Sequence, residues 1–149
     1  MATKRLDVIL KAAADPTRLR LLNLLRLGNI CVCDLQAVLG ISQSNVSRHL
    51  AVLRHAGIVM DSRKGNRIVN TLLPADTPQK QVLFDVLDRC CPLDPEMQTD
   101  IANFRQAVAE GRCRLEPKDD AGPTPDRVNG GAALAAANSM PGKNTLCSK

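Results

Sequence analysis

Apolar residues recur at the spacing of an α-helix along most of the chain. Rows of apolar residues three or four positions apart predict helices over 3–13, 16–27, 34–39, 43–55, 77–90 and 95–110. Asp15, Ser42 and Asp94 stand where helix-capping side chains are favoured, and a proline follows each aspartate at the first helical position. The chain is therefore predicted to be mainly helical.

The period of the pattern changes between the fourth and fifth predicted helices. Residues 58–61 and 67–72 are rich in β-branched residues, and the intervening sequence RKGN favours a turn. This pattern predicts a β-hairpin with a basic tip. A short helix, a glycine turn, a longer capped helix and a basic hairpin follow one another in a winged helix-turn-helix. The predicted fold class is therefore mainly α with a small β-hairpin, arranged as a winged helix-turn-helix.

The positive charge is concentrated around the longer capped helix of this motif and the hairpin. Residues 115–149 contain four basic and four acidic groups, so the net charge of +5 comes from residues 1–114. Residues 42–67 carry five basic groups and one acid, which is typical of a surface that binds a polyanion. The alternative interpretation is an ordinary solvated basic face.

The helix over residues 43–55 has the composition expected of a DNA-reading helix. Small, hydroxyl, amide and arginine side chains lie opposite its apolar row, and it contains no acid. Small residues allow close approach to the major groove, and hydroxyl, amide and guanidinium groups contact phosphates and base edges. With the basic hairpin, the predicted DNA contacts are Ser42, Gln43, Ser44, Asn45, Ser47, Arg48, Arg63, Lys64 and Arg67.

Six cysteines indicate a second kind of chemistry. No apolar run reaches the length of a membrane span, and no secretory signal pattern is present, so we expect a cytoplasmic protein. Cysteines in that compartment bind metals, respond to oxidation or lie buried more often than they form disulfides. Cys31 and Cys33 flank one valine, and a disulfide between them is the least favoured interpretation because so short a bridge is strained. No catalytic motif is recognisable, so we expect no enzyme.

The segment ICVCDLQAVLGISQSNVSRHLAVLRHAGIV, followed by RKGNRIVNTL, resembles the ArsR/SmtB family of metalloregulatory repressors, in particular its arsenic-responsive ArsR branch. The resemblance covers roughly residues 5–90. It implies a homodimer, paired through the first helix and the helix after the wing, that binds the operator of a metalloid-resistance operon. It also implies release of the DNA when As(III) or Sb(III) binds cysteine thiolates, with Cys31 and Cys33 as ligands and no organic cofactor.

The ArsR branch is known for three-sulfur coordination, and some members have a third cysteine where this chain has Gln36 or Ala37. The third ligand must therefore come from elsewhere. Residues two apart on an ideal helix point about 200° from each other. We therefore expect arsenic binding to distort the start of the short helix and so to disturb the DNA-reading helix packed against it.

A second set of cysteines leaves the site open. Cys90 and Cys91 end one predicted helix and Cys113 follows the next, and some ArsR-like repressors bind arsenic at such a vicinal pair. The intervening helix would separate Cys91 from Cys113 by about 24 Å within one chain. A thiol-oxidation sensor of the same fold is the alternative function.

The composition also suggests a division of the chain. Residues 1–92 are expected to form a winged helix-turn-helix domain for DNA binding and dimerisation, and residues 93–114 a C-terminal helical extension. Residues 115–149 are rich in Gly, Pro, Ala, Asn and Asp and lack periodicity, so they are expected to form a disordered tail.

Overall fold

The computed structural model describes residues 5–118, and residues 1–4 and 119–149, with most of the predicted tail, lie outside this description. The helices and strands run in the following order: α1 (Leu6–Ala13), α2 (Pro16–Leu25), β1 (Ile30–Cys31), α3 (Val32–Leu39), α4 (Gln43–His55), β2 (Val59–Lys64), β3 (Arg67–Leu72), α5 (Pro78–Cys90), a short 3-10 helix (Cys91–Leu93) and α6 (Pro95–Ala109). The winged helix-turn-helix predicted from the pattern is confirmed, with six α-helices and a small antiparallel sheet within residues 5–118.

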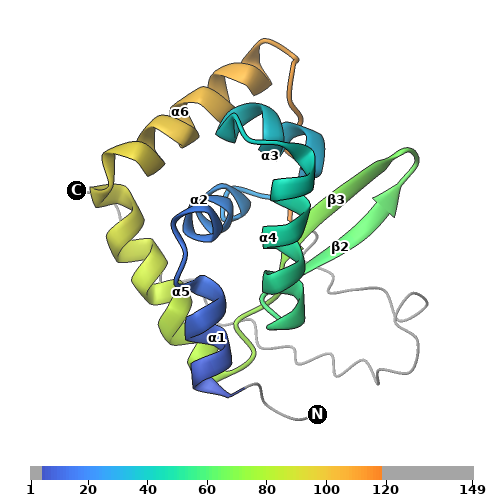
Figure 1. Ribbon diagram of the computed structural model, residues 1–149. Coiled ribbons are helices and arrows are strands. Elements are labelled where there is room, and N and C mark those ends of the chain that lie inside the picture. Colours follow the sequence, from blue (N-terminus) through green and yellow to red (C-terminus); the bar gives the residue numbers. More distant parts are fainter. Residues whose placement is uncertain (1–4, 119–149) are drawn as a thin grey trace. The chain divides into compact units, whose positions relative to one another are not determined.

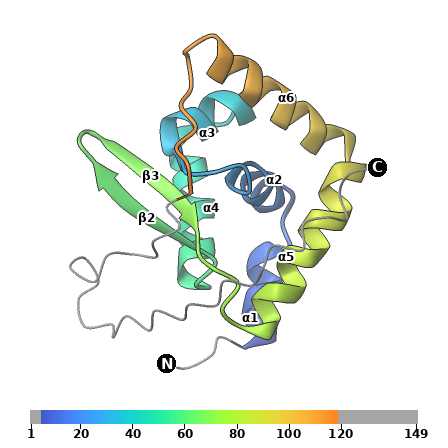
Figure 2. The same cartoon turned by 180° about the vertical axis from the view of Figure 1, so that it is seen from behind.

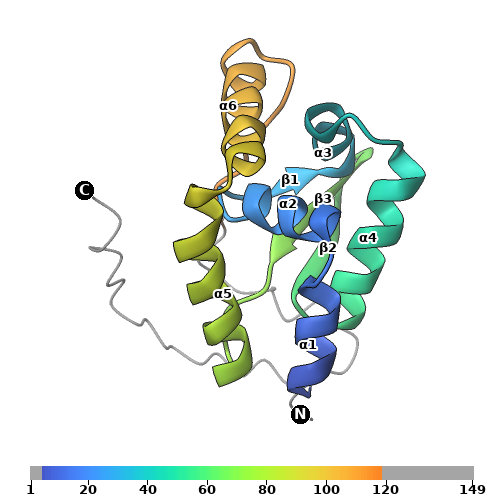
Figure 3. The ribbon, with the colours of Figure 1, turned by 60° about the vertical axis from the view of Figure 1, so that its left-hand side comes forward.

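Helix α2 lies at the centre, and the other helices pack around it (Figures 1 and 3). Its leucines at 21, 22, 24 and 25 are fully buried, more than a single amphipathic row would bury. The Arg20 guanidinium donates two hydrogen bonds of 2.7 Å to the buried Asp100 carboxylate, which ties α2 to α6. A bidentate pair of this kind fixes orientation as well as distance.

Capping side chains set the predicted helix starts. The Asp15 carboxylate accepts the Arg18 N–H at 3.0 Å, and the Ser42 hydroxyl accepts the Asn45 N–H at 3.3 Å. Asp94 caps α6 in the same way. Each cap satisfies a backbone donor that has no partner within its helix, which is why these starts were predictable.

Helix α3 begins two residues earlier than the pattern predicted. Cys31 occupies its N-cap with an extended backbone (φ −77°, ψ 157°), and its sulfur accepts the Asp34 N–H at 3.4 Å. Gly40 ends the helix in the left-handed conformation (φ 66°), from which the chain turns into α4. Helices α3 and α4 pack against each other (Figure 1).

The sheet has three strands in the order β1-β3-β2, one more than predicted. The hairpin pairs Lys64 with Arg67 across a tight turn at Gly65 and Asn66, so β2 extends into the expected loop. Strand β1 pairs Cys31 with Val69 of β3. Two residues are too few to show a period in the sequence, so only the structure reveals that Cys31 joins the same sheet as the wing strands β2 and β3, which project from the helices in Figure 2.

The start of the predicted tail is ordered, which corrects the expectation for residues 115–118. The Asn29 N–H donates to the Glu116 carbonyl at 2.9 Å, and the Glu116 N–H donates back at 3.0 Å. The Asn29 amide also donates to the Pro117 carbonyl at 2.9 Å. A single backbone bridge leaves no periodic trace in a sequence.

Within residues 5–118, no helix is both long and apolar enough to span a membrane.

Candidate cysteine site and nucleic-acid interface

Cys31, Cys33 and Asp34 come together where β1 passes into α3. One donor atom from each, two sulfurs and a carboxylate oxygen, lie within 4.8 Å of one another. Cys31 and Asp34 are buried, whereas Cys33 is exposed. Among the described residues, this is the one such group of three or more His, Cys, Asp or Glu side chains. Two sulfurs with a carboxylate suit a soft or borderline metal ion.

The two sulfur atoms form a disulfide in this structure, with the Cα atoms 5.5 Å apart. The expectation that a bridge between Cys31 and Cys33 is unfavourable is therefore wrong. A Cα separation of this size is ordinary for disulfides. The reason is local: Cys31 has the extended backbone of a cap, so the two side chains are not related by the helical angle.

The same geometry removes the reason given for the predicted distortion of the helix. Because Cys31 precedes the first turn of α3, its sulfur reaches that of Cys33 while residues 32–39 stay helical. Unwinding of the helix is thus not required to bring the two sulfurs to one ion. Any coupling to DNA must come from changes in what surrounds the pair.

Arg67 and Asp34 form the polar surroundings of Cys31. The Arg67 guanidinium donates from Nη2 to the Cys31 sulfur at 2.9 Å and to the Asp34 carboxylate at 2.9 Å. Asp34 also accepts the Arg114 N–H at 2.9 Å, and its other carboxylate oxygen lies 3.7 Å from the Cys33 sulfur. Contact between Arg67 and DNA stays a prediction.

A cavity of about 170 Å³ joins the cysteine pair to the helix-turn-helix. Cys31 and Cys33 line it together with Gln43 and Ser47 of α4, and residues of the wing complete it: Asn66, Arg67 and Ile68. Gln43 and Ser47 are predicted DNA contacts. The sulfur atoms therefore face the same space as part of the surface expected to meet DNA.

Helix α4 has the two faces that the pattern predicted. Val46, Leu50 and Leu53 are fully buried, and the predicted contacts at its start are exposed or half-buried. Arg48 is exposed, and its guanidinium donates to the Asn45 side chain.

Two basic residues of the wing differ in their partners. Arg63 is exposed near the hairpin tip, where it donates to the Gly65 carbonyl at 3.1 Å. Lys64 is paired with the Glu116 carboxylate at 2.7 Å.

The second set of cysteines is not brought together. Cys90 is exposed at the end of α5 and Cys91 is buried beside it, whereas Cys113 is buried beyond the other end of α6. Burial raises the pKa of Cys91, against the opposing effect of Arg26. Burial also raises the pKa of Cys113, and the neighbouring Asp34 carboxylate raises it further. Cys113 thus lies beside the first cysteine site.

Sequence reasoning missed Asp34 as a member of the site and Arg67 as its partner. Asp34 directly follows the cysteine pair, so its proximity could have been noticed. Nothing in the spacing links Arg67 or Arg114 to residue 34, because those contacts join positions 33 and 80 residues apart.

Comparison with known proteins then gives the family. Residues 15–61 match the family of bacterial regulatory proteins described as the arsR family. The chain is 40% identical over 83 residues to the arsenical resistance operon repressor of Escherichia coli, covering 55% of this chain and 71% of that protein. The chain belongs to the arsR family of bacterial regulatory proteins. This is a family of helix-turn-helix transcriptional regulators and not of enzymes, as the sequence predicted.

Two further comparisons show how much of the chain is similar to other proteins. The arsenic resistance transcriptional regulator ArsR1 of Pseudomonas putida is 48% identical over 73 residues, 48% of this chain and 56% of that protein. The chain therefore spans just over half the length of that relative. The crystal structure of the transcriptional repressor BigR from Xylella fastidiosa is similar with a TM-score of 0.50 at 30% identity, covering 58% of this chain and 83% of that one.

Proposed function

We propose that the protein is a homodimeric repressor of a metalloid-resistance operon, released from its operator when As(III) or Sb(III) binds the thiolates of Cys31 and Cys33. The observation that carries this proposal is the shared cavity, which places the sulfur pair beside Gln43 and Ser47 on the DNA-reading helix. The names of the relatives, which are arsenic-resistance regulators and repressors, support the choice of inducer.

Release follows from what the pair touches. Reduction of the disulfide yields two thiolates, which bind a soft ion in preference to carboxylate or imidazole sites. An ion held between two sulfurs keeps them further apart than a direct bond does. Cys31 is fixed by β3 and by the Arg67 guanidinium, so the change falls on Cys33 and on the cavity side of α4. DNA affinity falls because the metalloid-loaded arrangement fits the operator less well.

Dimerisation is proposed from an exposed apolar face. Leu6 and Leu10 of α1 are each 48% exposed, and Val82 and Val86 of α5 are 57% and 49% exposed. The two helices pack side by side (Figure 3), so these side chains form one surface that a second copy would cover. A two-fold dimer would place two DNA-reading helices about 34 Å apart, one turn of the double helix.

The disulfide favours a second candidate function, a thiol-oxidation sensor that uses the same two cysteines. In that case the bond between Cys31 and Cys33, rather than a bound ion, would change the cavity beside α4. The two functions share the site and the DNA surface and differ in the signal.

Fluorescence anisotropy of a labelled operator fragment tests both functions. The full chain, reduced with a phosphine that offers no competing thiol, is expected to bind one DNA sequence preferentially, with affinity falling steeply as salt increases. Arsenite added under these conditions should release the DNA. Peroxide, added after the phosphine has been removed and itself removed by catalase before the measurement, should not release it. Release by peroxide alone would support the oxidation sensor, and release by neither would contradict both.

A further inference from the structure

We propose that Cys113, carried by the segment that follows α6, supplies the third sulfur for As(III) bound at Cys31 and Cys33. This inference deepens the proposed function and rests on it, because it completes the same site. It also supplies the third thiol that α3 lacks, since this chain has Gln36 and Ala37 where some family members have a cysteine.

The path of the chain after α6 places Cys113 at the site. Cys113 follows directly after the turn that ends α6, and its N–H donates to the Ala107 carbonyl at 3.1 Å. The next residue, Arg114, donates its N–H to the Asp34 carboxylate at 2.9 Å. Two residues further on, Glu116 pairs with Asn29, just before β1. The segment is therefore attached to the cysteine site at Arg114, and to the residue just before β1 at Glu116.

Asp34 is the common neighbour of the three cysteines. Its N–H donates to the Cys31 sulfur, and its carboxylate lies 3.7 Å from the Cys33 sulfur. The same carboxylate accepts the N–H of Arg114, the residue directly after Cys113, at 2.9 Å, so Cys113 lies next to Asp34 along the chain path. A soft metalloid prefers sulfur to a carboxylate oxygen. Cys113 is thus a better third ligand than Asp34, although Asp34 is nearer in this disulfide-bonded state.

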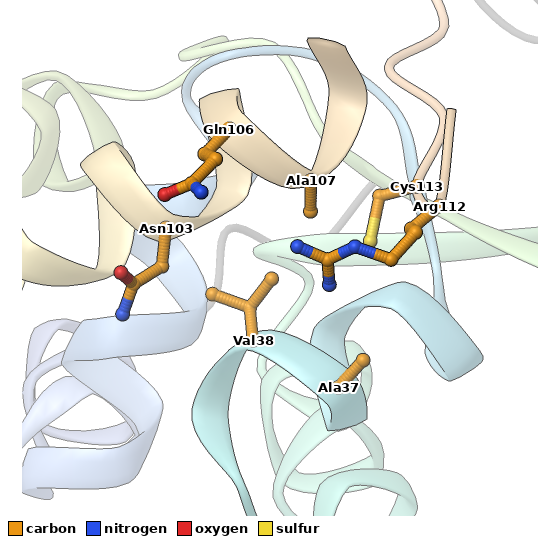
Figure 4. Close-up of a pocket in the computed structure, with 7 residues that line it drawn as sticks. All are labelled: Ala37, Val38, Asn103, Gln106, Ala107, Arg112 and Cys113. Atoms are coloured by element: carbon orange, nitrogen blue, oxygen red, sulfur yellow. The ribbon is translucent and has the colours of Figure 1, made fainter. Parts of the chain in front are cut away.

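The Cys113 side chain borders open space. A second cavity, of about 220 Å³, lies between α3 and α6 and is lined by Cys113 together with Ala37 and Val38 near the end of α3, and not by Cys31 or Cys33. Figure 4 shows Cys113 at its edge, beyond the last turn of α6. Residues 112–115 are neither helical nor stranded, so the segment can shift without breaking a regular element. Cys113 is only 4% exposed, which shields a bound metalloid from water.

The chemistry balances without a change in the oxidation state of arsenic. A cellular dithiol first reduces the Cys31–Cys33 bond, giving two electrons and two protons to form two thiols. Arsenous acid, As(OH)₃, then exchanges its three As–O bonds for three As–S bonds. Each hydroxide leaves as water with the proton of one thiol. With only two thiols, one hydroxide would stay on the arsenic.

Two arsenicals separate a three-sulfur site from a two-sulfur site. Arsenite has three exchangeable positions, whereas phenylarsine oxide has two because one is taken by carbon. Their affinities are measured on the full-length chain reduced with a phosphine, for the unsubstituted protein, Cys113→Ser, Cys113→Ala and Cys31→Ser/Cys33→Ser. Cys90→Ser is the matched control, since Cys90 is a free cysteine at the far end of α6. Thermal unfolding of each variant confirms that it is folded.

Both Cys113 variants are expected to lose at least about tenfold in arsenite affinity, the lower end of the loss that even changes around the ligands cause. Their affinity for phenylarsine oxide should change by less than about twofold, which shows that the two-sulfur part is intact. Arsenic X-ray absorption should count three sulfur neighbours in the unsubstituted protein and two in Cys113→Ala. Unchanged arsenite affinity with three sulfur neighbours still present in Cys113→Ala would overturn the inference.

The Cys31→Ser/Cys33→Ser variant distinguishes the two possible failures. It should lose both arsenicals. If it keeps arsenite affinity, the proposed site itself is wrong. If it loses both while Cys113→Ala behaves like the Cys90→Ser control, only the assignment of the third ligand fails.

Discussion

The two pairs of cysteines differ in their surroundings as well as in their sequence spacing. Cys31 and Cys33 lie where a strand passes into a helix, with a cation, a carboxylate and a cavity that reaches α4. Cys90 and Cys91 are adjacent in sequence, yet one side chain is exposed and the other is buried. Within residues 5–118, no third metal-ligating side chain joins that second pair.

The comparison shows that a sensor needs a connection as well as ligands. A ligand shifts an equilibrium only to the extent that it binds the two states differently. The first pair shares its cavity with Gln43 and Ser47, so an ion bound there would lie beside α4. The second pair lies between α5 and α6, at the side of the molecule away from the wing (Figure 1). The first pair is therefore the better candidate for control of DNA binding.

The largest effect is expected from removing each pair in turn. In Cys31→Ser/Cys33→Ser, arsenite should weaken operator binding by less than about twofold, instead of the roughly 5–150-fold typical of coupled sites. Cys90→Ser/Cys91→Ser should keep the response of the unsubstituted protein. Anisotropy titrations of reduced protein on operator DNA give both values. The opposite pattern would move the sensor to the end of α5.

The second prediction is that a change in the DNA-contacting surface affects operator affinity and leaves arsenite affinity unchanged. Arg48→Ala should lower operator affinity by about 1–3 kcal/mol, the usual value of an arginine–base contact. Arsenite affinity of the DNA-free protein should not change, because Arg48 is not among the residues lining the sulfur cavity. Arg105→Ala on α6 is the control, with the same charge and exposure but outside the helix-turn-helix. Equal losses in both variants would indicate non-specific charge attraction.

A smaller effect is expected on the free energy of unfolding when a carboxylate near each cysteine pair is removed. Asp34 is 8% exposed and binds Arg67 and the Arg114 N–H, whereas Asp88 near the second pair is 48% exposed and binds Arg26. Asp34→Ala should cost about 2 kcal/mol of unfolding free energy, since it leaves buried donors unpaired. Asp88→Ala should cost less than about 1 kcal/mol, as exposed ion pairs do. Urea unfolding monitored by circular dichroism measures both, and equal costs would contradict the described packing around Asp34.

The smallest effect concerns the ionisation of the second pair. Burial raises the pKa of Cys91, so iodoacetamide at neutral pH should label the exposed Cys90 well before Cys91. The unfolded chain loses this proton at a lower pH than the folded protein. The contribution of Cys91 to stability is therefore fully present below the ordinary thiol pKa and declines as pH rises above it. Cys91→Ala should flatten that decline, and simultaneous labelling of both thiols at pH 7 would count against the burial of Cys91.

The sequence predicted the fold well because the signals were local. Asp15, Ser42 and Asp94 cap helices through contacts three residues away, and the apolar rows of α4 mark its buried face. The cysteine site was predicted only in part. Its conformation depends on strand β1, which is two residues long, and its polar partners come from positions 67 and 114. No periodicity reports contacts of that kind.

The central claim is that arsenic binds at the start of α3. Anomalous diffraction at the arsenic edge, from crystals of the reduced full-length protein loaded with arsenite, tests it most directly. We expect one arsenic peak per protomer, bonded to the sulfurs of Cys31 and Cys33. A single peak between Cys90 and Cys91, with no arsenic density at the start of α3, would contradict the account.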